Sequence, residues 1–398
     1  MNINNTVGPD ESTVVNSNTT QLRKLYEHFQ KRKLIWIIVF IIFIVIIVTV
    51  ATSTVLSNKT KREKVVTTEI TTATTTTTTI TTPATTTRKQ LIPSVIINNN
   101  TKWKQNESTV AGGNGQGNKS NQLSRPFGFY VDDDDHSIYI ADNSNHRVVR
   151  WEFDADEGVV VAGGNGYGNK IDQLYGPVDV ILDKDKKYII ICDQGNRRVV
   201  EWSLQDSHDQ EILIGSIACY GLALDDNGDL YISDWIKHQA IRWQEGDTKG
   251  TIVAGGNGQG NHLNQLNFPV YIFVDECDSV YIVDHNNNRV MKWMKNAIEG
   301  ILIAPGQVSE ENENPLSQPL GVIVDHIGNV YLSNYNTHQI TRWLPGAIEG
   351  THIVGENEYG SLSAPFQCSS DISFDRQGNL YVVDRDNHRI QKFDIDLD

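Results

Sequence analysis

Histidines recur at one position in four repeated units of this chain, and imidazole is a common zinc ligand and proton carrier. They are His146, His238, His338 and His388. The same position holds Arg197 and Asn288 in two other units. Because Zn–N bonds are only about 2.1 Å long, histidines from separate units form a metal site only if they converge. We expect a structural role for this position and assign no metal or cofactor, with Zn²⁺ and Ca²⁺ as the ions to test.

Aspartates form a second repeated set, in which an Asp precedes an Arg by five residues. The pairs are Asp142 with Arg147, Asp193 with Arg198, Asp284 with Arg289 and Asp384 with Arg389. Carboxylates can bind Ca²⁺ or transfer protons, but an Asp beside a loop also accepts hydrogen bonds from loop N–H groups and from Arg. The denser runs 132–135 and 225–229 lack the Gly and Glu positions of an EF-hand loop. We interpret the pairs as structural and the runs as polar turns.

Glycine-rich segments repeat as AGGNGQGN at 111–118, AGGNGYGN at 162–169 and AGGNGQGN at 254–261. A phosphate-binding loop must open a helix whose N–H groups face the anion, whereas these segments lie between predicted strands. We interpret them as flexible connections in which Gly permits a positive φ. Because they recur on one rim, they are also candidates for ligand contact.

The candidate ligand-binding residues are the polar and aromatic side chains of the loops on that rim. They are Asn145, His146, Asn196, His238, Trp235, Asn287, His338 and His388. Trp235 lies outside the repeat register, so we expect it to be exposed as a binding anchor. No catalytic residue is assigned, because the sequence has no G-x-S-x-G motif and no Cys beside a His and Asn.

Six repeated units must position these side chains. Each contains an alternating apolar strand that ends at Asp142, Asp193, Asp234, Asp284, Asn334 or Asp384. An aromatic residue follows nine positions later in every unit, at Trp151, Trp202, Trp243, Trp293, Trp343 or Phe393. Polar turns separate four short strands in each unit, and no helical period appears. This pattern predicts one blade of a β-propeller per unit, with the aromatic residues packed between blades.

The two ends of this repeat region complement each other. The sixth unit ends five residues after Phe393, before a fourth strand can form, while a lone fourth strand begins near Ser108. Pairing these ends would remove the exposed edges of an open ring. We therefore predict an all-β, six-bladed β-propeller closed by the N-terminal strand. Unit two is about nine residues short and lacks the glycine-rich loop, so its outer strand is the least certain.

The repeated core resembles the NHL repeat over residues 103 to 398. It reads D-x-x-N-H-R in Asn145-His146-Arg147 and Asn387-His388-Arg389, with weaker copies elsewhere. Gln239, Gln339 and Asn334 depart from the pattern. The resemblance implies a six-bladed propeller used mostly for recognition. The family also includes a zinc-dependent peptide-amidating lyase, so a metal-dependent lyase or lactonase with its site in the channel is the alternative.

A different composition precedes the propeller. Leu34 to Leu56 carry no charge and include LIWIIVFIIFIVIIVTV, which is long enough to cross a bilayer as a helix. We predict a cytosolic tail (1–33), a transmembrane helix (34–56), a disordered Thr-rich linker (57–100) and the propeller (101–398). A cleaved signal peptide is the alternative, although its apolar region is normally shorter and follows a shorter basic head.

The linker sets the predicted topology. Threonine makes up 15 of the 21 residues from 67 to 87, as in O-glycosylated stalks, although an unglycosylated polar linker remains the alternative. N-glycosylation sequons follow the apolar segment at Asn58, Asn99, Asn106 and Asn118. We predict a single-pass type II glycoprotein with its propeller outside the cell.

Charge and cysteines limit the partners. Residues 90–398 contain 44 acidic and 23 basic residues, a formal net charge of −21, which argues against nucleic acid. Cys192 and Cys219 lie in successive units and can form a disulfide, while Cys277 and Cys368 lie farther apart; the spacing does not decide the pairing. We predict a binding module for a protein, peptide or glycan rather than an enzyme.

Overall fold

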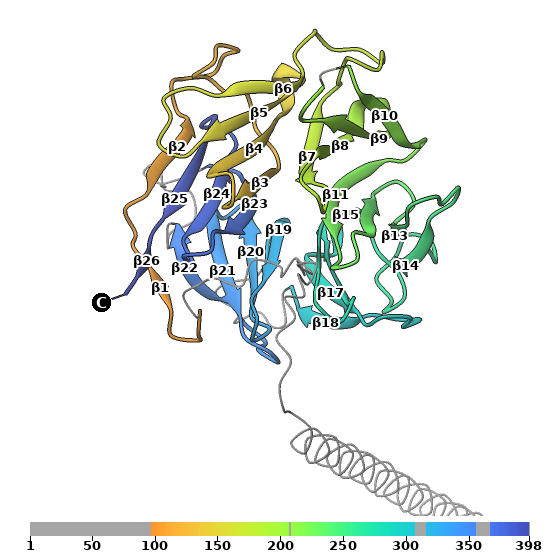
Figure 1. The fold of residues 1–398 in the computed structure, drawn as a ribbon. Helices are drawn as coiled ribbons and strands as arrows, with labels where there is room; N and C mark the ends of the chain where they lie inside the picture. Colours follow the sequence, from red (N-terminus) through yellow and green to blue (C-terminus); the bar gives the residue numbers. More distant parts are fainter. Residues whose placement is uncertain (1–96, 207, 307–315, 356–366, 398) are drawn as a thin grey trace, which may run out of the picture. The chain divides into compact units, whose positions relative to one another are not determined.

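The computed structural model describes residues 97–206, 208–306, 316–355 and 367–397. These residues form six four-stranded antiparallel sheets arranged as the blades of a propeller (Figure 1). The chain divides into two units, Met1–Ala84 and Thr85–Asp398, and all described residues belong to the second. The predicted tail, the transmembrane helix and most of the linker lie outside the described residues. Within the described ranges, no helix is long and apolar enough to span a membrane.

Each blade runs from an inner strand to an outer strand. Blade 1 contains β3 (Phe129–Asp132), β4 (Ser137–Asp142), β5 (Arg147–Glu152) and β6 (Val159–Gly163). Blade 2 contains β7 (Pro177–Leu182), β8 (Tyr188–Asp193), β9 (Arg198–Ser203) and β10 (Gln210–Gly215). Blade 3 contains β11 (Cys219–Leu224), β12 (Leu230–Asp234), β13 (Gln239–Trp243) and β14 (Thr251–Gly255).

The second half of the ring repeats this order. Blade 4 contains β15 (Pro269–Val274), β16 (Val280–Asp284), β17 (Arg289–Trp293) and β18 (Ile301–Ala304). Blade 5 contains β19 (Pro319–Val324), β20 (Val330–Asn334), β21 (Gln339–Trp343) and β22 (Thr351–Gly355). Blade 6 contains β23 (Ser369–Phe374), β24 (Leu380–Asp384), β25 (Arg389–Phe393) and, as its outer strand, β2 (Ser108–Gly112).

The hydrophobic core lies between neighbouring blades. Trp151 of blade 1 packs in one cluster with Tyr381 and Val383 of blade 6, and Trp343 of blade 5 packs with residues of blade 4. Trp151, Trp293, Trp343 and Phe393 are almost fully buried. A large aromatic ring at the same place in each blade removes apolar area from water at every junction, which confirms the predicted packing role.

The ring closes as predicted. Strand β2 pairs with β25, with Ser108 opposite Lys392 and Gly112 opposite Arg389. A short second pairing joins β1 (Lys102–Trp103) to β26 (Ile395–Asp396). The Trp103 indole N–H donates to the Gly378 carbonyl at 2.9 Å, and Ile97, which the sequence places in the linker, is fully buried in the same core cluster.

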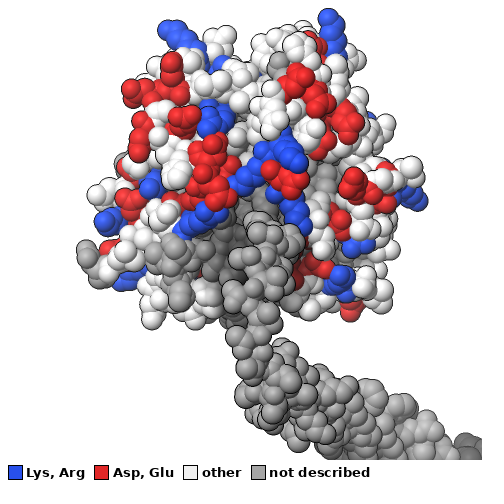
Figure 2. All heavy atoms as spheres, in the orientation of Figure 1, with Lys and Arg blue, Asp and Glu red and all other residues white. Residues whose placement is uncertain are grey.

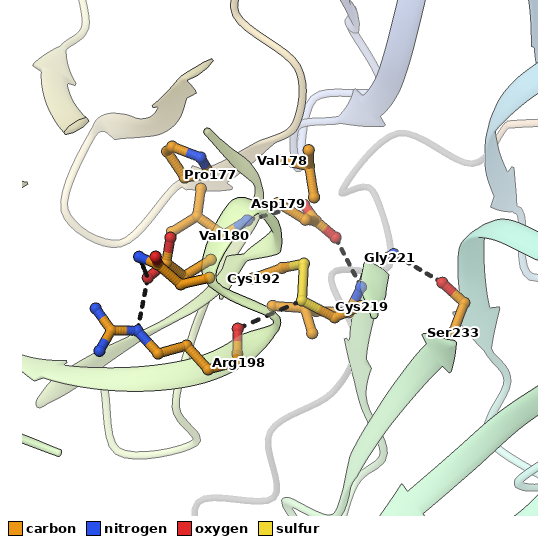
Figure 3. Close-up of a disulfide and its surroundings, with 12 residues drawn as sticks. Pro177, Val178, Asp179, Val180, Cys192, Arg198, Cys219, Gly221 and Ser233 are labelled. Carbon is orange, nitrogen blue, oxygen red and sulfur yellow. Dashed lines mark hydrogen bonds and ion pairs between the residues drawn. A yellow bond between two sulfur atoms is a disulfide. The ribbon is translucent and has the colours of Figure 1, made fainter. Parts of the chain in front are cut away.

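The junction between blades 2 and 3 differs from the others. Strand β10 does form the outer strand of blade 2, and residues 216–218 alone connect it to β11. A disulfide joins Cys192 in β8 to Cys219 in β11, with their Cα atoms 5.8 Å apart (Figure 3). Cys277 and Cys368 are free. The disulfide therefore joins these blades where the glycine-rich loop is missing.

Candidate functional site

The Asp–Arg pairs hold the loops on one face of the propeller, here called the rim. Asp142 accepts hydrogen bonds from the Ser124 N–H (2.7 Å), the Asn145 amide (2.8 Å) and the Arg147 Nε (2.7 Å). Burial raises the pKa of Asp142, and these three donors oppose that rise. The terminal nitrogens of Arg147 donate to carbonyls of residues 118, 119 and 122. Arg198 and Arg289 bind carbonyls of the two other glycine-rich loops in the same way. These three loops are therefore fastened to the blades and are not the flexible connections that we expected.

The same network recurs around the ring. Asp193 accepts from Tyr175 N–H, Asn196 and Arg198, and Asp284 accepts from Asn267 N–H, Asn287 and Arg289. Asp384 accepts from Gln367 N–H, Asn387 and Arg389. The structural interpretation of the pairs is therefore confirmed. Asp225 likewise accepts N–H groups of its own turn, from residues 227 and 229.

The repeated histidines connect each blade to the next one. All four have a positive φ between 52° and 59°, a conformation that His and Asn adopt more readily than most residues. The Nδ1 atom of His146 accepts the Gly176 N–H at 3.1 Å, and that of His388 accepts the Arg125 N–H at 3.1 Å. His238 and His338 make the equivalent bonds to residues 268 and 368, and Asn288 does so through its amide oxygen to residue 318. The expected structural role is confirmed.

The other predicted ligand-binding residues also have partners within the protein. The amides of Asn145, Asn196 and Asn287 each bridge a buried Asp to a glycine-rich loop carbonyl. Trp235 is half-buried rather than fully exposed, and its ring lies 4.9 Å from that of Phe268. The structure places these residues on the rim but does not bring them into one cavity, and their role in ligand binding stays a prediction. Among the described residues, no three His, Cys, Asp or Glu side chains gather in a geometry that could hold a metal.

A second set of residues, which includes two acidic side chains, lies near the propeller axis. Each blade contributes one residue, in its inner strand or, in blade 1, directly before it. These residues stand four positions before the Asp of the following turn: Gly128, Asp179, Gly221, Tyr271, Gly321 and Asp371. We call these six residues the axial ring. Glycine alternates with a larger side chain around the ring, so blades 2, 4 and 6 fill the space that blades 1, 3 and 5 leave open.

Gly128 shows how tightly the larger residues converge. A Cβ atom on Gly128 would lie 2.5 Å from Asp179 Oδ1 and 2.9 Å from the Tyr271 hydroxyl. The next residue, Phe129, donates its N–H to Asp371 Oδ2 at 3.2 Å. Both carboxylates and the phenol therefore approach the same short stretch of blade 1, which leaves no room for a side chain at residue 128.

The two axial carboxylates have backbone partners and no cationic partner. Asp179 accepts the N–H groups of Leu222 (2.7 Å) and Val180 (2.9 Å); Asp179 and Val180 are labelled in Figure 3. Asp371 accepts those of Phe129 and Ile372. Within the described part of the chain, no Lys or Arg forms an ion pair with either residue. Burial raises the pKa of both groups, and the charge of Asp371 raises the pKa of Asp179 further.

A cavity of about 680 Å³ extends from the axial ring to the turns at the end opposite the rim. We call this cavity the chamber. Its wall is largely apolar, with Ile181, Leu222, Ile272, Val322 and Ile372 among the lining residues. Its volume lies within the ~300–1,000 Å³ range of small-molecule sites. The chamber therefore has the size of a ligand site and a polar group at its closed end.

The mouth of the chamber is acidic. Six carboxylates of the turns line it, at Asp134, Asp225, Asp226, Asp275, Glu276 and Asp325. The basic residues there are themselves paired: Lys186 and Arg376 contact Asp134, and Lys292 contacts Asp275. Arg376 and Lys186 lower the pKa of Asp134 to about 2. The six acidic residues outnumber these three basic ones, so we expect the mouth to attract cations rather than anions. On the face of the molecule shown in Figure 2, acidic and basic side chains are interspersed.

Aromatic residues lie on the rim side of the axial ring. Phe127 and Tyr220 directly precede Gly128 and Gly221, with their ring centroids 6.2 Å apart. The guanidinium of Arg385 lies 4.5 Å from the Phe127 ring and donates to the Tyr335 hydroxyl at 3.0 Å. This layer separates the chamber from the rim loops.

Asp179 and Asp371 are not among the site residues predicted from the sequence. Both lie inside inner strands, PVDVIL and SSDISF, where an apolar run is expected. Alignment of the six inner strands carries the signal, because acidic residues are rarely fully buried in the middle of an apolar strand. The chamber itself has no comparable signal in the sequence.

Known structures share the fold at low sequence identity. A Bacteroides thetaiotaomicron protein of unknown function superposes with a TM-score of 0.58 at 18% identity, covering 74% of this chain and 77% of that one. An auxiliary nutrient binding protein from the same species gives 0.57 at 14%, covering 73% and 76%. A gluconolactonase from Xanthomonas campestris gives 0.51 at 13%, covering 69% and 87%. These structural similarities support only the assignment of the propeller fold.

Comparison with family models identifies sequence repeats in the first and the last blade of the propeller. A search of the curated proteins finds no match to the chain. The NHL repeat family matches residues 123–151, which include β3 to β5 of blade 1, and residues 366–393, which include β23 to β25 of blade 6. The chain is thus a six-bladed β-propeller that carries NHL repeats in the two blades that meet where the ring closes.

Proposed function

We propose that this protein is a membrane-anchored extracellular binding module whose ligand enters the chamber. One observation carries the proposal: the chamber ends at two buried carboxylates that the repeated hydrogen-bond network does not use. A protein or peptide ligand would place one side chain in the chamber, and a glycan or smaller molecule would place one terminal group there. The fold shared with auxiliary nutrient binding proteins supports a binding role.

The location outside the cell has independent support. Disulfides persist in oxidising compartments, and Cys192 and Cys219 are bonded. The sequon residues Asn99, Asn106 and Asn118 are exposed, as glycan attachment requires, while Asn58 lies outside the described residues. Protease protection of the propeller in sealed vesicles tests this topology, and digestion from the cytosolic side would contradict it.

A metal-dependent lyase or lactonase remains the second candidate. The shared fold of the gluconolactonase is the observation that favours it, together with two carboxyl groups whose raised pKa values suit proton transfer. Zinc or calcium that copurifies in stoichiometric amount and survives dialysis would support this candidate over simple binding.

Binding in the chamber is testable with a variant that fills it. Ala223 lines the chamber, so Ala223→Trp would occupy space needed by a ligand. The full chain in detergent micelles is screened by thermal shift against peptides, glycans and small metabolites. We expect some compounds to raise the melting temperature of the natural protein but not of this variant.

The matched control is Ile348→Trp, because Ile348 is 65% exposed and does not line the chamber. This control should respond to ligands as the natural protein does. Ligands that stabilise Ala223→Trp equally well would contradict binding in the chamber.

A further inference from the structure

The chamber carboxylates have unused hydrogen-bonding capacity. An ionised carboxylate offers about four acceptor positions, and Asp179 and Asp371 each use two of them on backbone N–H groups. Their relative exposures are 3% and 8%, so bulk water does not readily satisfy the rest. Burial disfavours the charged form of a carboxyl group unless a cation binds beside it, and these two groups line the chamber.

The fold does not require acids at these positions. Inner strands of blades 3, 4 and 5 make the same register shift as that of blade 6, between the first and fourth residues of each strand. They do so with Gly221, Tyr271 or Gly321 in the axial ring. Because this bulge forms without an acid in three blades, backbone geometry does not explain the acid of blade 6. The inner strand of blade 2 shifts register at a different place, between Pro177 and Asp179.

The surroundings specify the ligand chemistry. Eight acidic side chains line the chamber against three cationic ones, Lys186, Lys292 and Arg376, and this excess of acid disfavours an anion. The apolar wall between these ends suits a hydrocarbon group. The Tyr271 ring also lines the chamber and can face a cation. A metal ion fits less well, because Ca²⁺ needs 6–8 oxygen ligands and apolar residues surround the carboxylates.

We propose that the chamber binds a small organic amine, or an amine group on a larger ligand, with its ammonium held by Asp179 and Asp371 and its apolar part against the chamber wall. Both carboxylates approach the Gly128–Phe129 stretch, so one ammonium can reach both. The acidic mouth favours entry of the cation. This inference rests on the proposed binding function and names the class of ligand that the chamber accepts.

Three probes of similar size test the charge requirement. Hexylamine, its neutral analogue hexanol and its acidic analogue hexanoate are titrated calorimetrically into the full chain in detergent micelles. We expect hexylamine to bind at least ~10-fold more tightly than hexanol and hexanoate not to bind. Equal affinity for hexylamine and hexanol would overturn the proposal.

Two variants locate the site. The double variant Asp179→Asn with Asp371→Asn should weaken hexylamine binding at least ~10-fold. The control Glu299→Gln with Glu349→Gln loses two charges at exposed positions outside the chamber and should bind like the natural protein. Unchanged binding by the first variant would overturn the proposal. If that variant does not fold, Ala223→Trp supplies the same test, since it should exclude hexylamine.

Other results separate this inference from the proposed function. Calcium chloride alone is titrated in the same way. If calcium binds and its binding requires Asp179 and Asp371, the chamber holds a metal site and the amine proposal is overturned. If a peptide or glycan bound in the chamber while hexylamine did not, the amine inference would fail and the binding function would stand. If no ligand depended on the chamber, both would fail.

Discussion

Two sets of buried aspartates in this propeller have opposite surroundings. Asp142 and its equivalents on the rim each contact an Arg, an Asn and a backbone N–H. Asp179 and Asp371 on the axis are as deeply buried but contact backbone N–H groups without a cation. The first arrangement occurs in four blades and the second in two. The difference separates side chains that build the blades from side chains that are available to a ligand.

Energetics explains why the two sets should behave differently. Removing one partner of a buried ion pair leaves an uncompensated charge and strongly destabilises a protein. A buried carboxylate without a cation already carries that cost, so its removal should cost little stability. We therefore expect loss of a rim Arg to destabilise the protein and loss of an axial carboxylate to cost little stability.

The largest effect should follow loss of a rim Arg. Arg147→Ala leaves Asp142 buried without its cation and releases loop carbonyls that Arg147 now binds. We expect the free energy of unfolding to fall by about 3–5 kcal/mol, measured by urea denaturation. Arg147→Lys, which keeps the charge, should lose less. A fall below ~1 kcal/mol would break the proposed distinction between the two sets.

Next in size should be loss of the disulfide. Blade 3 has Gln239 where blades 1, 2, 4 and 6 have the rim Arg, and no glycine-rich loop precedes it. We therefore expect the Cys192–Cys219 bond to be a substitute fastening at that junction. Replacing both residues by Ala should lower the free energy of unfolding by about 2–4 kcal/mol, seen as a lower denaturation midpoint. The exposed Cys277→Ala serves as the control. Equal stability of both variants would show that the junction does not need the bond.

A smaller effect concerns pH. Burial raises the pKa of Asp371 to about 7, against an ordinary value near 3.8 in the unfolded chain. Asp371 therefore binds a proton more tightly in the folded state than in the unfolded chain. Its contribution to the free energy of unfolding is greatest below pH 4 and falls as the pH rises towards 7. Relative to Asp371→Asn, the natural protein should lose at least ~1 kcal/mol between pH 5 and 8.

Thermal unfolding of the natural protein and of Asp371→Asn is measured from pH 5 to pH 8. Subtracting one stability profile from the other cancels the contributions of the remaining acidic groups. Burial and the charge of Asp371 raise the pKa of Asp179, and burial and both charges raise the pKa of the nearby Tyr271, so the protonation of these two groups is linked to that of Asp371. Parallel pH profiles for the two proteins would show that the axial carboxylates do not differ from exposed ones.

The smallest effect should come from the repeated histidines. His388→Ala removes the acceptor of the Arg125 N–H, and we expect a loss of about 1 kcal/mol. His388→Asn should be nearly neutral, because Asn288 fills the same position in blade 4. Differential scanning calorimetry distinguishes these variants. Loss of ligand binding in His388→Ala without loss of stability would instead favour the rim as the binding surface.

The sequence predicted the parts of the structure that repeat. The nine-residue offset from Asp142 to Trp151, seen six times, identified the blades, and the strand near Ser108 identified the closure. The role of the Asp–Arg pairs followed from the same repetition. Repetition is informative because six independent copies seldom share a pattern by chance.

What does not repeat was harder to predict. Asp179 is a single residue in an apolar strand, and its importance depends on its meeting Tyr271 and Asp371 from blades far away in the sequence. The pairing of Cys192 with Cys219 likewise depended on a Cα–Cα distance of 5.8 Å across two blades. Trp235 was expected on the surface, but it packs on Phe268. Such features arise from tertiary contacts, which spacing along one blade does not reveal.

The closure of the ring also determines the order in which the molecule can be completed during synthesis. Strand β2 leaves the ribosome first, yet its partner β25 follows it by more than 270 residues, as the pairing of Gly112 with Arg389 shows. Blade 6 therefore cannot close until translation of the propeller is nearly finished. Until then β2 has an unpaired edge that can bind other chains. A nascent chain stalled before β25 should consequently remain dependent on chaperones, although the five earlier blades already have all their strands.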